Sequence, residues 1–365
     1  MLSIVLYSVK GGIETYTLQL ANALAPIARV AYAVDRQKKR QILNQVSPKV
    51  TLIEFDRPRL REIWGVCNLY YLSRKIIEFK PDILHLQGDG VWESLLLRFL
   101  KHIPIINTVH DPIKHIDQRT YLNNWTMKDA INRSRGWVLH GQILKKIFLK
   151  KHKVSRDRIL VHPHGVYDFY LNFASRSQEK RKYILFFGAL RINKGPDLLL
   201  AAFDQIKNQV PGWKIVIAGH GDISKINFNQ NNKNRVIILN RYIDDAEAAS
   251  LFSKAGVVAL PYRHGSQSGV LSLAAAFYSP VVVTKVGNIP EILKDREHAL
   301  IIRPGDIAQL ADALLEIIKN DSLRSALGSN LGELGRLDWA WKRIAKKTLK
   351  FYEDCILKES YDRSN

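Results

Sequence analysis

Arg191 and Lys194 are two cations three residues apart, and they follow an apolar run, Tyr183–Phe187, that ends in Gly188. A helical pattern begins directly after them, at Gly195. An arginine offers a forked pair of donors and a lysine a compact charge, so cations at such a junction suit the oxygens of a diphosphate. The alternative is that both are solvated surface cations.

A second junction, Pro261–Val270, is rich in serine and glycine and contains no carboxylate. It follows the apolar run Val257–Leu260 and leads into a helical pattern. Because a helix N-terminus presents free N–H groups and a partial positive charge, this loop is suited to cradle a phosphate. A plain strand-to-helix connection has the same composition, so this alternative stays open.

Paired glycines, Gly11 and Gly12, follow the first apolar run, Leu2–Tyr7. They allow a ligand to approach the backbone closely and permit a positive φ angle. The segment does not contain the G-x-G-x-x-G pattern of a dinucleotide site. A tight turn without a ligand is the alternative.

Short apolar runs alternate with helical patterns along the whole chain, which predicts βαβ units and parallel sheets. In such sheets the ligand lies at the carboxyl ends of the strands, where all three junctions fall. The expected strands are 2–7, 30–34, 50–55, 83–86, 103–109, 158–163, 183–187, 214–218, 236–239, 257–260, 281–284 and 299–302. The expected helices are 14–25, 68–79, 142–152, 195–206, 246–253, 270–277, 306–319 and 338–358.

A polar stretch, residues 172–181, separates the two alternating series. The sequence therefore predicts an α/β protein of two doubly wound, Rossmann-like domains, 1–172 and 173–337, followed by a terminal helical segment, 338–365. From its pattern alone, that segment either caps the second domain or returns to the first.

The 365 residues carry 55 Lys and Arg against 34 Asp and Glu, a formal charge of +21. Residues 1–178 hold +14 of it, so we expect an acidic partner to meet the first half. No apolar run approaches the ~20 residues of a membrane-spanning helix, and the opening residues lack a signal-peptide pattern. Two cysteines cannot form a disulfide framework. We expect a cytoplasmic protein.

In this order along the chain, the segments resemble the retaining glycosyltransferases of family 4, which have the GT-B fold. Each motif is short, but together they span the chain from Gly11 to Tyr352. The motifs are Gly11-Gly12-Ile13-Glu14, Asp82-Ile83-Leu84-His85, Thr108-Val109-His110-Asp111, His162-Pro163-His164-Gly165-Val166-Tyr167-Asp168, Gly188 with Lys194-Gly195, Ala218-Gly219-His220-Gly221, Leu260-Pro261-Tyr262, Val286-Gly287-Asn288-Ile289-Pro290-Glu291, and Trp341 with Tyr352.

The resemblance implies two domains facing a central cleft, with the terminal helix crossing back to the first domain. It implies transfer of a hexose-type sugar from a nucleotide diphosphate, UDP- or GDP-linked, to a sugar or lipid-linked acceptor hydroxyl. Neither a cofactor nor a metal ion is expected, and no D-x-D motif occurs in the chain. Polysaccharide or glycolipid synthesis at the cell surface is the expected setting.

Residue by residue, the resemblance gives Arg191 and Lys194 the diphosphate and His110 a place beside the transferred sugar. The remaining donor contacts it implies are Gly11, Gly12, Gly188, Tyr242 beside the base, and the amides of Ser268, Gly269 and Val270. One departure concerns the paired glutamates, eight positions apart, that the family usually has around the diphosphate helix. Residues 265–274 contain neither, which leaves the ribose contacts and the donor open.

Lysines surround the apolar positions of 142–153, the pattern of a basic amphipathic helix that can lie on an anionic membrane. An ordinary domain helix with a solvated face is the alternative. With the cationic segments 36–40 and 57–61, the helix predicts weak peripheral membrane attachment and an anionic acceptor. Two other functions stay open: a nucleotide-sugar epimerase of GT-B fold, and a basic non-catalytic scaffold that binds membrane or nucleic acid. No nucleic-acid-binding motif supports the last of these, so no nucleic-acid partner is expected.

Overall fold

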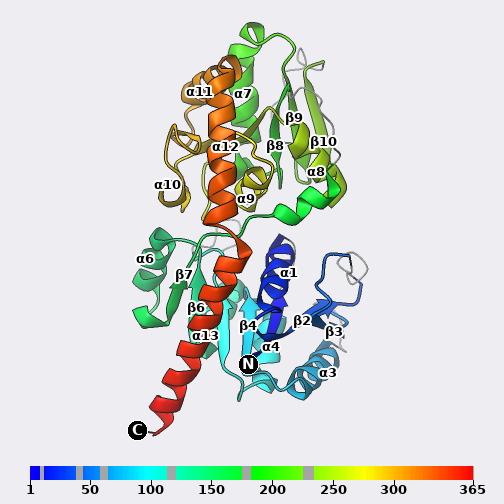
Figure 1. Ribbon diagram of the computed structural model, residues 1–365, viewed down its shortest axis with the longest axis vertical. Helices are drawn as coiled ribbons and strands as arrows, with labels where there is room; N and C mark the ends of the chain where they lie inside the picture. Colours follow the sequence, from blue (N-terminus) through cyan, green and yellow to red (C-terminus); the bar gives the residue numbers. More distant parts are fainter. Residues whose placement is uncertain are drawn as a thin grey trace. The chain divides into compact units, whose positions relative to one another are not determined.

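The computed structural model describes residues 1–8, 12–37, 44–57, 65–112, 121–174, 182–224 and 234–364. The chain forms two compact units (Figure 1). Unit 1 consists of Met1–His162 together with Trp341–Asn365, and unit 2 consists of Pro163–Ala340. Unit 1 is therefore built from two separate stretches of the chain.

Unit 1 contains a seven-stranded sheet in the order β3-β2-β1-β4-β5-β6-β7. All its paired strands run parallel. Its elements are β1 Ser3–Ser8, α1 Gly12–Leu24, β2 Arg29–Asp35, β3 Val50–Phe55, α3 Gly65–Glu78, β4 Ile83–Gln87, α4 Val91–Phe99, β5 Ile105–Thr108, α5 Tyr121–Arg133, β6 Gly136–Leu139, α6 Gln142–Lys151, β7 Ile159–Val161 and α13 Trp341–Ser364. The strand order reverses between β1 and β4, which makes that position the switch point of the sheet.

Unit 2 contains a six-stranded parallel sheet in the order β10-β9-β8-β11-β12-β13. Its elements are the 3₁₀ helix η3 Asp168–Phe173, β8 Tyr183–Phe187, η4 Ile192–Lys194, α7 Pro196–Ile206, β9 Lys214–Gly219, β10 Val236–Asn240, α8 Asp245–Lys254, β11 Val257–Leu260, α9 Gly269–Ala276, β12 Val281–Thr284, α10 Ile289–Ile292, β13 Leu300–Ile302, α11 Ile307–Lys319 and α12 Asp321–Leu337. Here the order reverses between β8 and β11. The two doubly wound sheets confirm the predicted α/β fold class.

The central strands are apolar because helices cover both faces of each sheet, as parallel sheets require. Ile4–Tyr7 of β1 and Val257–Leu260 of β11 are buried along their whole length. In unit 2, Val257 and Ala259 of β11 join a core with apolar side chains of α7 and α11. Because the paired strands are parallel, the loops that follow them lie at the same, carboxyl edge of each sheet.

The units divide at His162/Pro163, ten residues before the expected boundary at 172/173. The reason is that η3 packs against α8 and α9 of unit 2. Unit 2 likewise extends through Ala340, since the carbonyl of Trp339 accepts a hydrogen bond from the Val166 N–H. The terminal helix α13 belongs to unit 1, where it packs against α1.

Candidate functional site

The switch point of unit 2 lies between β8 and β11. The loop with Arg191 and Lys194 follows β8, and the serine- and glycine-rich loop follows β11. A glycine, which has no Cβ, allows these two loops to contact each other. Gly195 has a φ of 72°, and a Cβ added there would lie 2.1 Å from the Pro261 carbonyl oxygen. The loop after β8 therefore touches the loop after β11 backbone to backbone.

Gly188 directly follows β8 and has a φ of 118°, and its backbone carbonyl approaches Gly219 closely. A Cβ on Gly219 would lie 1.8 Å from the Gly188 oxygen. The N–H of Gly188 donates to Ala218 and that of Leu190 to His220. These contacts hold the segment that precedes Arg191 and Lys194 against the end of β9.

Lys194 lies at the centre of this arrangement, because its Nζ is 3.9 Å from the centroid of the Tyr262 ring. The Tyr262 hydroxyl in turn forms a 3.1 Å hydrogen bond with the Ser268 hydroxyl. Ser268 is the N-cap of α9, and its side chain accepts from the Leu271 N–H. One buried tyrosine thus connects the cation to the start of a helix.

Helix α9 begins at Gly269, directly after that cap, so the N–H groups of Gly269 and Val270 lie in its first turn. The first N–H groups of a helix have no partner inside the helix, and the helix dipole makes their end positive. Such an N-terminus, with a lysine nearby, is suited to hold phosphate. The arrangement supplies the amides that sequence analysis assigned to the diphosphate.

Two further contacts hold the loop after β11 in place. Arg263 forms a bidentate ion pair with Asp197 of α7, at 2.8 and 2.6 Å. That pairing raises the pKa of the Arg263 guanidinium. Gly287, with a φ of 55°, lies against the carbonyls of Gly265 and Ser266. The serine–glycine loop is therefore braced from both sides.

Arg191 and Tyr242 are placed differently from Lys194. The Arg191 side chain is exposed, and no ion pair to it is found in the part of the chain that the structure describes. Tyr242 follows β10 and is 79% exposed. Both lie on loops at the carboxyl edge of the sheet.

Three residues around α9 were missed by the sequence analysis as site residues. Tyr262 and the pair His164 and Tyr167 pack beside it: a Cβ on Gly269 would lie 3.4 Å from the Tyr167 ring and 3.9 Å from His164. His164 also lies 3.3 Å from the Ser272 hydroxyl. Their only sequence signal was their place in short motifs, and a motif does not reveal which residues of other segments its members pack against.

The switch point of unit 1 lies between β1 and β4, where α1 begins at Gly12. Gly11 lies outside the described residues. His110 follows β5 at the same edge and is half-buried. Its Nε2 lies 3.2 Å from the Gln87 side-chain oxygen, and its ring is 5.2 Å from that of Tyr16.

Buried histidines surround this edge of unit 1. His140 is packed 5.1 Å from His110 and 5.4 Å from His162, measured between ring centroids. His85 is fully buried, and burial together with the neighbouring His162 lowers its pKa to about 3. At neutral pH the His85 ring is therefore uncharged.

The depressed pKa of His85 makes unit 1 sensitive to acid. The pKa of His85 is about 3 in the folded chain, whereas the ordinary pKa of a histidine is 6.5, so between these values the unfolded chain binds a proton that the folded chain excludes. Stability therefore falls as the pH falls, by about 2 kcal/mol between pH 6.5 and about pH 5. Urea unfolding at both pH values measures the loss. It should be smaller in His85→Gln, whose amide retains a donor and an acceptor.

Glu93 acts in the opposite direction, because burial raises the pKa of its carboxyl group. The folded state then holds a proton at a pH where the unfolded state has released it, so acidification favours folding through this residue. Wild type and His85→Gln share Glu93, so the difference between their losses of unfolding free energy on acidification gives the contribution of the histidine. An equal acid response in the two proteins would contradict the prediction.

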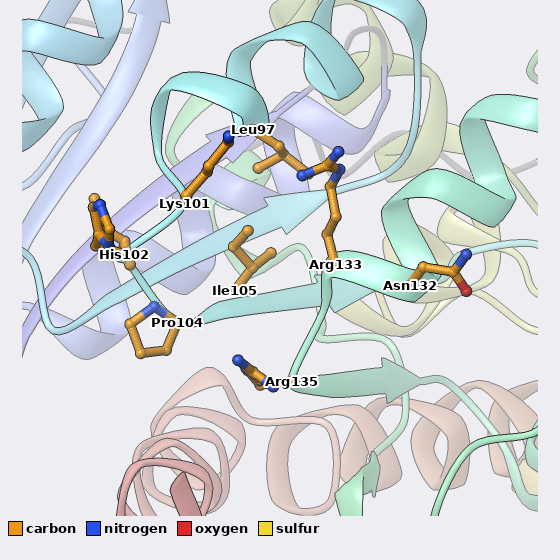
Figure 2. Close-up of a pocket in the computed structure, with 9 residues that line it drawn as sticks. Leu97, Lys101, His102, Pro104, Ile105, Asn132, Arg133 and Arg135 are labelled. Atoms are coloured by element: carbon orange, nitrogen blue, oxygen red, sulfur yellow. The ribbon is translucent and has the colours of Figure 1, made fainter. Parts of the chain in front are cut away.

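Two surface pockets in the described part of the chain lie away from both switch points. The one in unit 1 has a volume of about 210 Å³ and lies at the amino edge of β5 and β6, where Figure 2 shows Lys101, His102, Arg133 and Arg135 around it. The one in unit 2, about 610 Å³, is lined by residues that precede β8, β9, β11 and β12 and by residues of α11 and α12. Strands begin at these edges, so no strand-to-helix loop presents free amides there.

No helix in the described part of the chain is both long and apolar enough to span a lipid bilayer. Among the same residues, no group of three or more His, Cys, Asp and Glu side chains is arranged to hold a metal ion.

Comparison with known proteins agrees with this architecture. Residues 181–320 match the family model described as "Glycosyl transferases group 1", and residues 10–168 match the model described as "Glycosyltransferase Family 4". The phosphatidyl-myo-inositol mannosyltransferase of Mycobacterium tuberculosis is 28% identical over 364 residues, covering 95% of this chain and 94% of the relative.

Two solved structures share the fold. The Anabaena protein HepE, solved with UDP and glucose, has a TM-score of 0.75 at 16% identity, covering 97% of this chain and all of that one. The sucrose-phosphate synthase of Thermosynechococcus elongatus has a TM-score of 0.73 at 19% identity, covering 98% and 100%. Identities this low show the fold alone.

Proposed function

The chain belongs to the group 1 glycosyltransferases of family 4, which have the GT-B fold, and from that premise we propose its reaction. We propose that it transfers a hexose from a UDP- or GDP-sugar to an acceptor hydroxyl, with retention of the anomeric configuration. The family matches support a glycosyltransferase, which favours this function over an epimerase or a non-catalytic scaffold. The donor, the stereochemistry and independence from metal ions are parts of the proposal.

The observation that carries the proposal is the contact chain from Lys194 through Tyr262 to Ser268 at the start of α9. In it a cation, a ring and a helix N-terminus lie at a switch point, where doubly wound sheets bind ligands. Arg191, exposed on the same loop, provides a second cation. We propose that the diphosphate of the donor binds here.

Breaking the bond between sugar and diphosphate makes the sugar cation-like and adds negative charge to the leaving group. Lys194 and the amides of Ser268, Gly269 and Val270 interact more strongly as that charge develops, so they lower the barrier as well as binding the donor. His110 of unit 1 is proposed to orient the transferred sugar. In this scheme the leaving phosphate accepts the proton of the acceptor hydroxyl.

Thermal-shift measurements with UDP, GDP and ADP and their sugars test the donor site. A ligand that binds only the folded state stabilises it, by about 2.7 kcal/mol at a hundred times its Kd. We expect one nucleotide to raise the melting temperature of the wild type, and the shift to be lost in Arg191→Ala. Absence of a shift with every nucleotide would overturn the proposal.

The acceptor is proposed to be an anionic or lipid-linked glycan precursor, which places the enzyme in polysaccharide or glycolipid synthesis at an anionic membrane surface. Helix α6 contributes Leu144 and Phe148 to the core of unit 1, so its apolar face is already used. Its exposed side chains include Lys146, Lys150 and Lys151. Attachment would therefore be electrostatic, without insertion of the helix.

The charge reversal Lys146→Glu with Lys150→Glu should weaken sedimentation of the protein with phosphatidylglycerol-containing vesicles by several-fold at low salt. Salt should weaken wild-type binding as well, because exposed charges are screened over about 8 Å at physiological ionic strength. Lys285→Glu with Lys319→Glu, which reverses two exposed lysines of unit 2, is the matched control. No binding of wild type to anionic vesicles at low salt would overturn the attachment.

A further inference from the structure

The pocket at the amino edge of the unit 1 sheet, called the amino-edge pocket below, is lined by cations (Figure 2). As far as the structure describes the chain, its lining includes Lys101, Arg133 and Arg135 but no aspartate or glutamate. The three cations come from separate segments: Lys101 follows α4, Arg133 ends α5 and Arg135 directly precedes β6. The fold thus gathers three positive charges around one hollow of about 210 Å³.

Buried apolar side chains lie between these cations. Leu97 and Ile105 both line the pocket, and they are 1% and 4% exposed. Figure 2 shows Ile105 in the middle of the three cations. Apolar walls keep the local dielectric constant low, so charges of one sign in such a hollow attract a counter-ion more strongly than they would on an open surface. The amino-edge pocket therefore favours an anion.

Arg133 is oriented by its own helix. Its Nε donates to Asp129 Oδ1 at 3.0 Å, and the Asp129 side chain is 14% exposed. Arg98 Nη1 lies 3.9 Å from the other oxygen of Asp129, so that carboxylate faces two arginines. Within the described residues, neither terminal nitrogen of Arg133 donates a hydrogen bond. These two nitrogens form the fork that matches two oxygens of a phosphate or a carboxylate.

Backbone hydrogen bonds hold the segments that carry the other two cations. The N–H of Arg135 donates to the Ile105 carbonyl at 2.7 Å, and the N–H of Ile103 donates to the Leu100 carbonyl at 3.2 Å. Lys101 is exposed, and no ion pair to it is found in the part of the chain that the structure describes. Its charge is therefore available to a ligand.

We propose that the amino-edge pocket binds the phosphate monoester group of a small phosphorylated molecule or of a lipid headgroup. Three full positive charges favour a phosphate monoester, with about two negative charges near neutral pH, over a carboxylate with one. The volume is below the roughly 300–1,000 Å³ of pockets for larger ligands, so it fits a phosphate group rather than a whole nucleotide sugar. The pocket lies at the edge opposite to the loops that follow β1 and β4, so it does not depend on the proposed function.

Calorimetric titration with inorganic phosphate at constant ionic strength tests the pocket. The Lys194→Ala background reduces binding of phosphate at the candidate site of unit 2. In it, Lys101→Gln with Arg135→Gln should weaken phosphate binding about 10²-fold, because each charged hydrogen bond contributes roughly tenfold. Arg74→Gln with Lys146→Gln is the matched control, since it removes one exposed arginine and one exposed lysine of unit 1 that do not line the pocket. The control should bind phosphate as the background does.

Arg133→Lys tests the fork while it keeps the charge. A lysine can still pair with Asp129, so unfolding in urea should stay near wild type, whereas phosphate binding should weaken about tenfold. Cations that serve only the negative ends of their helices would behave in the opposite way, with lower stability and unchanged phosphate affinity. That result, or equal phosphate binding by the double variant and its control, would overturn the proposal.

Vesicles distinguish the two sources of the phosphate, because phosphatidic acid presents a monoester and phosphatidylglycerol a diester. With a lipid headgroup as the ligand, wild type should prefer phosphatidic acid vesicles at matched surface charge, and the double variant should lose that preference. With a free molecule, glycerol 3-phosphate should bind as inorganic phosphate does, and the two kinds of vesicle should bind equally.

The outcomes for the two sites are separate. Absence of phosphate binding in a protein that still binds a nucleotide would overturn the amino-edge pocket alone. Failure of every nucleotide to bind, with phosphate binding that depends on Lys101 and Arg135, would overturn the proposed function alone.

Discussion

Replacing Lys194 with alanine is expected to lower kcat/KM for the nucleotide sugar by about 10²–10³-fold, the usual loss when one preorganised charge-stabilising contact is removed. Lys194 is the cation that the structure places on the Tyr262 ring, one hydrogen bond from the cap of α9. Without it, the charge that develops on the leaving diphosphate is opposed only by backbone amides and by the more exposed Arg191. Steady-state kinetics and nucleotide thermal shifts measure the two effects.

Lys207→Ala is the control for this experiment. Lys207 lies directly after the other end of helix α7 and pairs with Asp204, so its loss removes the same charge from unit 2 without touching the candidate site. Its kinetics should match those of wild type. A Lys194→Ala enzyme that keeps its kcat/KM within threefold would show that the diphosphate binds elsewhere.

Gly195→Ala is expected to destabilise unit 2 by about 4 kcal/mol, because it combines backbone strain with overpacking. The residue has a φ of 72°, which an L-amino acid adopts only at a cost, and the new methyl group would lie 2.1 Å from the Pro261 carbonyl oxygen. The Pro261 carbonyl belongs to the backbone, so it cannot move aside as the end of a flexible side chain could. Nucleotide binding should weaken too, since the loops after β8 and β11 must separate.

Gly212→Ala separates the two contributions. Gly212 has a φ of 82°, yet nothing lies within 4 Å of the position of its Cβ. Its replacement should therefore cost only the strain, about 1–2 kcal/mol. Urea unfolding of both variants measures the difference. Equal losses would mean that the loops do not meet as closely as the structure has them.

The strands were predictable because buried parallel strands are continuous apolar runs, and the expected runs at 183–187, 257–260 and 281–284 coincide with β8, β11 and β12. Helix α12 was not predicted. Its three glycines, Gly328, Gly332 and Gly335, disfavour a helix by propensity, by about 1 kcal/mol each.

Those glycines are spaced so that they lie on one face of α12. A Cβ on Gly332 would lie 2.2 Å from the Tyr278 ring, and one on Gly328 would lie 2.4 Å from the Tyr278 carbonyl. Close packing of α12 against Tyr278 thus requires glycines, which helix propensity disfavours. Helix α4 was missed for a related reason: Glu93 and Ser94, two polar residues, lie on its buried face.

At the candidate site, sequence analysis identified Lys194 and Ser268 but not the ring between them. A tyrosine at the end of an apolar run is ordinary core material, and only coordinates show Tyr262 contacting both. In unit 1 the same limit applied to Gln87. Its distance to His110 depends on the register of β4 and β5, which no motif encodes.

The discontinuity of unit 1 has a consequence for how the molecule is made. Residues 163–340, a complete folding unit, are synthesised before Tyr352. Until then the hydroxyl that His85 bonds is missing, and α1 lacks the helix that packs on it. All of unit 2 is thus present in the growing chain before unit 1 is complete, whereas the amino-terminal segment must wait, with part of its apolar surface uncovered, for the second stretch of its own unit.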